Sequence, residues 1–246
     1  MFRRRFKSSY NNVGDGVYAV NKNLRLIPVS EADNTCIGIT LVYDRHRIMI
    51  EKNEDSNQSY KDASAGYNRN YLFYWGGYGT DQPGITNYNE LDESNTSGYL
   101  KSEHGSYIST PNISANITAW TSGALSDWDG KANSNVLKGV TTGGGSYTSY
   151  ATAGHVLNTF LASADAKGYD DWYIPSCGQL SLIYMYLISV NNALLAIGGQ
   201  PLDTRYYWSS SEHSSNSGWI VLFNNGRTFT RYKRLTSSVR FVRDIE

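Results

Sequence analysis

An α+β fold is predicted for this sequence by three observations. Residues 36–50 show the period-two alternation of strands, and residues 149–167 and 178–197 carry apolar side chains at three- and four-residue steps. Strand-like runs return after residue 206. Strands therefore occupy both ends of the chain with two helices between them, which is the segregated order of α+β domains.

Two hairpins are expected near the N-terminus. Residues 15–27 alternate around the turn at 21–23, and residues 36–50 alternate around a turn at 44–47. The second alternation predicts half-buried strands. We expect His46, in that turn, to be a solvent-exposed loop residue rather than a metal ligand.

The C-terminal part combines the two helices with a short antiparallel sheet. The helices end at Gly168 and at Gly198, where glycine commonly ends a helix. Asn224-Asn225-Gly226 predicts a type I′ hairpin, because Asn-Gly tolerates positive φ. Trp208 and Trp219 lie in strand-like runs beside small or apolar residues and are expected to be buried.

Composition and charge exclude several classes of protein. The 246 residues carry 22 basic and 22 acidic side chains, whereas a nucleic-acid binder needs a basic surplus. No run of eighteen apolar residues predicts membrane insertion, and no apolar stretch follows the charged start to predict a signal peptide. Cys36 and Cys177 are too far apart in sequence for metal-ligand spacing, so neither a metal nor a cofactor is expected.

Tyr, Ser, Asn and Gly together make 94 of the 246 residues. These residue types dominate antibody binding loops, where tyrosine supplies rigid contact area and the small residues adaptable hydrogen bonds. A loop-rich β protein has the same composition because its turns need Gly, Asn and Ser. Composition alone leaves both readings open.

Local motifs do not commit the chain to catalysis. Asp127-Trp128-Asp129-Gly130 resembles the opening of a calcium loop, but its twelfth position is Lys138 instead of a carboxylate. We therefore expect a structural turn in which Asp side chains bond backbone amides. The glycine-rich run 141–146 lacks the Lys-Ser/Thr of a phosphate-binding loop, and no serine lies in a G-x-S-x-G context.

The C-terminal half carries a specific series of motifs. They are Asp171-Trp172-Tyr173-Ile174-Pro175-Ser176, Tyr207-Trp208-Ser209-Ser210-Ser211-Glu212, Gly218-Trp219, and Val239-Arg240-Phe241-Val242-Arg243, preceded by the run 127–133. This series resembles the C-type-lectin-fold proteins of gut bacteria and their phages, in the superfamily that includes formylglycine-generating enzymes. It is most similar to the variable proteins of diversity-generating retroelements. The resemblance covers residues 127–243.

The resemblance implies a C-type lectin fold whose exposed residues on the last strands are diversified to bind different targets. We expect a ligand-binding domain at 53–246, preceded by a β-strand segment at 1–52. The ligand-binding residues that the resemblance implies are His213, Ser217, Ile220, Leu222, Arg227, Phe229, Arg231, Tyr232, Arg234 and Leu235. Large side chains in this set, such as Ile220 and Phe229, are then expected to point to solvent.

The residues themselves agree with a binding role for this segment. Residues 227–235 combine aromatic side chains with arginines, the residue types of interface hot spots. No acid occurs between Glu212 and Asp244, while six basic residues lie within 227–243. An acidic or carbohydrate-rich partner would suit such a face. An edge strand protected by charge is the alternative.

Together these observations favour a non-enzymatic binding protein that contacts a host-cell surface protein or glycan, with no nucleic acid partner. A phage tail is the expected location, ahead of an adhesin on the bacterial surface, and assembly into a homo-oligomer is left open. The alternative is an oxidoreductase related to formylglycine-generating enzymes, which would require Cys36 and Cys177 to lie within bonding range.

Overall fold

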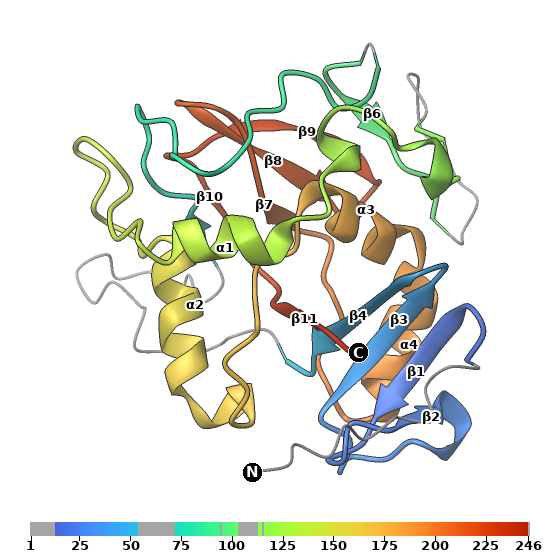
Figure 1. Cartoon of the computed structure of the whole chain (residues 1–246). Coiled ribbons are helices and arrows are strands. Elements are labelled where there is room, and N and C mark those ends of the chain that lie inside the picture. Colours follow the sequence, from blue (N-terminus) through green and yellow to red (C-terminus); the bar gives the residue numbers. More distant parts are fainter. Residues whose placement is uncertain (1–12, 54–71, 94, 103–112, 115, 246) are drawn as a thin grey trace, which may run out of the picture.

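The computed structural model describes residues 13–53, 72–93, 95–102, 113–114 and 116–245. The charged N-terminal start and part of the loop-rich stretch after residue 53 lie outside the described residues. The described chain forms an α+β fold, as predicted, with antiparallel sheets and α-helices between and beside them (Figure 1).

The first sheet has five strands in the order β11-β4-β3-β1-β2. Both predicted hairpins are confirmed. The C-terminal β11 completes this sheet by pairing with β4, so the two ends of the described chain meet in it. The strands are β1 (Gly16–Val20), β2 (Leu26–Pro28), β3 (Gly38–Tyr43), β4 (His46–Glu51) and β11 (Val242–Asp244).

Two details of this sheet differ from the sequence-based expectation. β3 is buried on both faces rather than on one, because Ile39 and Leu41 face one core cluster while Thr40 pairs with Met49, which lies in the other. His46 begins β4 instead of lying in a loop, and its ring stacks on Trp128 at a centroid distance of 3.9 Å.

The second sheet has four strands in the order β6-β9-β8-β7, and a two-stranded pair, β10-β5, lies beside it. The segment 224–226 forms the predicted hairpin between β8 and β9, but only Gly226 has positive φ, so the turn is not type I′. The strands are β5 (Phe73–Tyr74), β6 (Gly98–Tyr99), β7 (Tyr206–Ser214), β8 (Ser217–Leu222), β9 (Arg227–Tyr232) and β10 (Thr236–Ser237).

The helical region differs from the prediction at two places. The helix expected at 178–197 is two helices that meet at Tyr186 and are bent by 78°, since α3 is buried all round while α4 covers the first sheet. The helix at 130–137 was not expected, because glycine, serine and asparagine are weak helix formers. The α-helices are α1 (Gly130–Leu137), α2 (Ala153–Ala162), α3 (Cys177–Met185) and α4 (Leu187–Ala196).

Short 3-10 turns connect these elements at Val29–Glu31, Ile117–Ala119, Ala124–Ser126 and Ala164–Ala166. Among the described residues, no single helix is long and apolar enough to cross a membrane. Helices α3 and α4 have that length and composition only when they are taken together, and they are bent against each other.

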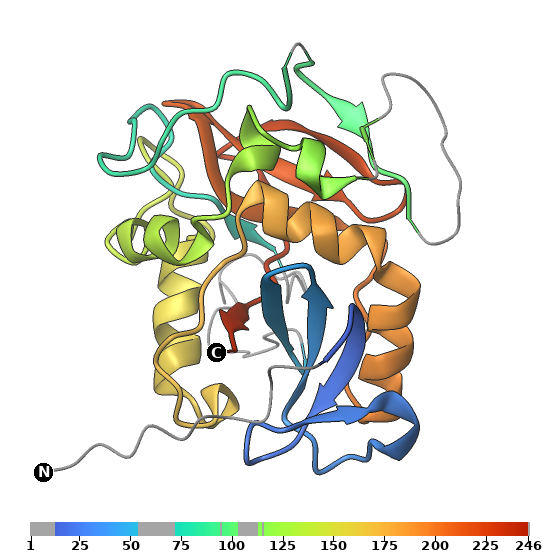
Figure 2. The same cartoon turned by 45° about the vertical axis from the view of Figure 1, so that its right-hand side comes forward.

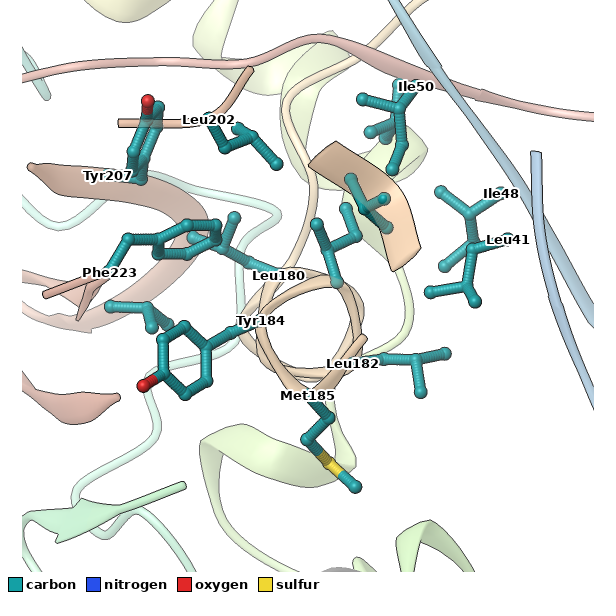
Figure 3. Packing of buried hydrophobic residues seen from close by; sticks show 14 of the residues in the cluster. Leu41, Ile48, Ile50, Leu180, Leu182, Tyr184, Met185, Leu202, Tyr207 and Phe223 are labelled. Atoms are coloured by element: carbon teal, nitrogen blue, oxygen red, sulfur yellow. The ribbon is translucent and has the colours of Figure 1, made fainter. Parts of the chain in front are cut away.

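Helix α3 lies between the two sheets and joins them into one core (Figure 2). Figure 3 looks along this helix: Leu182 points toward the strands that carry Leu41 and Ile48, whereas Tyr184 points toward Phe223. The rings of Tyr184 and Phe223 pack edge to face at 5.3 Å. Because α3 is sealed on all sides, the side of the second sheet that it covers is not available to a ligand.

Candidate functional site

Strand β9 carries four of the ten predicted binding residues and lies between β8 and the short β6. Alternation along the strand puts Arg227, Phe229 and Arg231 on one face of the sheet. The antiparallel register places Leu222 opposite Arg227 and Tyr206 opposite Leu222. We call these five side chains, Tyr206, Leu222, Arg227, Phe229 and Arg231, the β9 surface.

The arginines of the β9 surface lie against aromatic rings. The guanidinium of Arg227 is 4.6 Å from the ring centroid of Phe229, and that of Arg231 is 4.6 Å from Tyr206. The rings of Tyr206 and Phe229 meet edge to face at 6.1 Å. Stacking on a ring limits the movement of a guanidinium and leaves its in-plane N–H groups as the donors for a planar anion; in Arg231 one of them already donates to the carbonyl of Thr236.

A second group of aromatic side chains surrounds Arg234. Its guanidinium is between 5.2 and 5.4 Å from the ring centroids of Tyr78, Tyr147 and Tyr232, and it donates a hydrogen bond of 3.0 Å to the Tyr147 hydroxyl. We call these four residues the tyrosine cluster. It joins the end of β9 to two loops that are distant in sequence, and it holds Tyr232 half-exposed.

The six basic residues between 227 and 243 fall into two groups. Lys233, Arg240 and Arg243 are buried and form ion pairs with Glu212, Glu51 and Asp171 respectively. Arg227, Arg231 and Arg234 form no ion pair with a described residue and lie on aromatic rings instead. The unpaired positive charge of this segment is therefore concentrated on β9 and the turn that follows it.

The buried pair of Glu212 and Lys233 holds a loop against the end of the second sheet. Both side chains are fully buried. The Glu212 carboxylate also accepts the backbone N–H of Gln82, and the Lys233 ammonium donates to the carbonyl of Thr80 and lies 4.7 Å from the centre of the Trp75 ring. Burial raises the pKa of Glu212 and lowers that of Lys233, whereas the attraction between the two charges opposes both shifts.

Burial corrects part of the predicted binding face. Ile220 is fully buried, because its cross-strand neighbour Trp208 lies with it in the second core cluster and its other neighbour, Phe229, packs against that cluster. Ser217 is only 8% exposed, since it lies in the sheet between Ser214 and Tyr232. Neither is available to a ligand in this structure.

The remaining predicted residues reach the surface to different extents. Arg227, Tyr232 and Leu235 are exposed, whereas the other five are half-buried, so the expectation that Phe229 and Leu222 point to solvent is wrong. His213 packs edge-on against Trp219 at 5.7 Å, and burial lowers its pKa. The half-buried residues besides His213 are Leu222, Phe229, Arg231 and Arg234.

Sequence reasoning missed three residues that complete the surface. Tyr206 precedes the Tyr207–Glu212 motif and could have been found from its place in the strand. Tyr78 and Tyr147 lie in loops far from β9, and nothing in the sequence pairs them with residue 234. Only the abundance of tyrosine indicated residues of this kind.

The run that begins at Asp127 forms a buried polar junction. As predicted for a structural turn, the Asp127 side chain accepts the backbone N–H of Asp129, at 2.9 Å. Its other oxygen accepts hydrogen bonds from Asn133 and Ser211. Burial raises the pKa of this carboxyl. The junction fixes the start of α1 against β7 and contributes nothing exposed to the β9 surface.

The two cysteines are buried free thiols. Burial raises the pKa of the Cys177 thiol, which disfavours the thiolate that nucleophilic or metal-binding chemistry requires. Among the described residues, no group of three or more His, Cys, Asp or Glu side chains is placed to hold a metal ion.

Comparison with known proteins finds similarity of structure at low sequence identity. The sequence matches no protein-family model and no curated protein. A fimbrial protein from Bacteroides ovatus ATCC 8483 is similar over 95% of this chain, with 18% identity and a TM-score of 0.45. The chain spans about half, 49%, of the length of that protein. We draw no functional conclusion from a similarity at this level.

Proposed function

We propose that this protein is a non-enzymatic ligand-binding protein whose binding face consists of the β9 surface and the tyrosine cluster. The observation that carries the proposal is the set of arginines Arg227, Arg231 and Arg234, which form no ion pair with a described residue and lie on aromatic rings. Arginine, tyrosine and tryptophan dominate the hot spots of protein interfaces. Residues with a purely protective role on an edge strand would not need this stacking.

The sequence resemblance supports a C-type lectin scaffold for this face. In variable proteins of diversity-generating retroelements, constant residues form the core and diversified residues lie between them. The buried Trp208, Trp219 and Arg240 suit the first role, and Arg227, Tyr232 and Leu235 suit the second. A reverse transcriptase gene beside this gene, with an adenine-rich near-copy of its 3′ end, would be the genomic mark of such a system.

The location that follows from this proposal is a phage tail or a bacterial surface adhesin, and the partner is a protein or glycan on a cell surface. Binding at such a surface uses a rigid scaffold with exchangeable side chains. In the described chain, β9 is held on one side by β8 and at its end by the buried pair of Glu212 and Lys233, which provides that rigidity.

Replacing Arg227, Arg231 and Tyr232 together by serine tests the proposal. We expect loss of binding to bacterial surface material, measured by pull-down, because hot-spot energy is concentrated in such residues. Stability should change by no more than about 1 kcal/mol in chemical denaturation, as for residues outside the core.

Lys22→Ser with Arg25→Ser is the matched control, because both residues are exposed on the β1–β2 hairpin. This control should bind normally. If the triple variant unfolds, the three residues belong to the core. If it folds and binds as well as the wild type, the binding face lies elsewhere on the protein.

A further inference from the structure

We infer that the β9 surface binds an acidic polypeptide segment, whose carboxylates pair with Arg227 and Arg231; this inference rests on the proposed function. The two arginines are four residues apart on one face of β9. At the usual rise of a strand, their Cα atoms are about 13 Å apart. A surface segment with acidic side chains at matching spacing could engage both at once.

The guanidinium groups are preorganised for binding an anion. Each is held on a ring, and Arg231 also donates a hydrogen bond of 3.4 Å to the carbonyl of Thr236. The Nε of Arg231 is buried and has no hydrogen-bond partner. A carboxylate of a partner cannot reach this buried atom, so it would pair with the terminal N–H groups of the guanidinium. Charge-assisted arginine–carboxylate bonds are among the strongest hydrogen bonds in proteins.

The local charge also favours an acidic partner. Neither Arg227 nor Arg231 forms an ion pair within the described part of the chain, and no acid occurs in residues 213–243. Burial lowers the pKa of Arg231, so its charge is held in a partly desolvated place. The protein as a whole has zero net charge, so attraction of an acidic partner would be local to this surface.

The exposed apolar side chains favour a polypeptide over a polysaccharide. Tyr206 is 36% exposed, Tyr232 50% and Leu235 39%, and Leu222, opposite Tyr206 in the sheet, is half-buried. Aliphatic and aromatic side chains of a protein partner can cover this area and gain from its burial. An acidic polysaccharide offers charge but no such side chains.

The test is the binding of a fluorescein-labelled poly-L-glutamate peptide, followed by fluorescence anisotropy at low salt. The wild type is compared with the charge reversal Arg227→Glu with Arg231→Glu, which should weaken binding by about tenfold or more because like charges repel. Lys22→Glu with Arg25→Glu changes the net charge equally on the distant β1–β2 hairpin and should bind like the wild type. Arg227→Lys with Arg231→Lys should bind with intermediate affinity, since lysine keeps the charge but loses the fork.

The outcomes separate this inference from the proposed function. Equal peptide binding by the wild type and the charge reversal would overturn the inference, as would weakening in the hairpin control to the same extent. If the protein binds polygalacturonate more tightly than poly-L-glutamate, the partner is an acidic carbohydrate and the polypeptide inference is wrong. If the protein binds neither polymer, the inference of an acidic partner is wrong. The pull-down with the serine variant would then still decide whether this face binds a ligand.

Discussion

Replacing Lys233 with methionine is expected to destabilise the protein by about 3–5 kcal/mol, the cost of leaving one member of a buried ion pair alone. Methionine keeps most of the volume of the side chain beside the Trp75 ring but removes the positive charge. Glu212 would then be a fully buried carboxylate whose remaining partners include the N–H of Gln82. The free energy of unfolding from urea denaturation measures the effect.

The double variant Glu212→Gln with Lys233→Met separates charge from packing. Because neither position then carries a charge, much of the lost stability should return. A loss below about 1 kcal/mol in Lys233→Met would mean that the pair is open to water and does not anchor the loop. The loop anchored by this pair includes Tyr78 of the tyrosine cluster, so the single variant should also weaken ligand binding.

Trp219→Ala is expected to cost about 3–5 kcal/mol, as large-to-small replacements of core aromatics do. Trp219 is fully buried in β8, and its indole N–H donates a hydrogen bond of 3.0 Å to the carbonyl of Tyr88. The replacement removes both the packed ring and this bond. Thermal and urea denaturation report the change.

Trp219→Phe is the matched variant, since it keeps a packed ring and removes the indole donor. We expect it to cost no more than about 1–3 kcal/mol, the range for leaving a buried carbonyl unpaired, because the bond to Tyr88 is only partly buried. If Trp219→Ala were as stable as the wild type, the ring would not be part of the core, and the assignment of β8 faces would be wrong.

The sequence predicts most strands and the α+β order because alternation and turn residues are local signals. It fails where distant parts decide the structure. Half of α1 consists of glycine, asparagine and serine, which are weak helix formers, and Ser134 within it bonds the backbone at Ile174, a partner forty residues away. The apolar stretch is broken into two helices at Tyr186 because α3 packs between the two sheets while α4 packs on the first sheet alone.

Residues of the proposed binding face could be predicted from the sequence where a local pattern reveals them, and could not be predicted where packing between distant segments decides their exposure. Arginines and aromatic residues of β9 are visible in the sequence, and the structure places them on a partly exposed face. Ile220 was misassigned because the exposure of a strand residue depends on what packs against its face of the sheet, here the second core cluster, which also contains its cross-strand neighbour Trp208. Tyr78 and Tyr147 join the face only through the folded loops.

The most direct measurement of the central claim is an alanine scan of exposed residues over the whole surface, read as binding to a panel of bacterial cells by flow cytometry. The binding face predicts that losses cluster at Tyr206, Arg227, Arg231, Tyr232 and Arg234, while Lys22, Arg25 and Leu195 tolerate replacement. Losses that map to the N-terminal hairpins or to α4, with normal binding by the β9 variants, would contradict it.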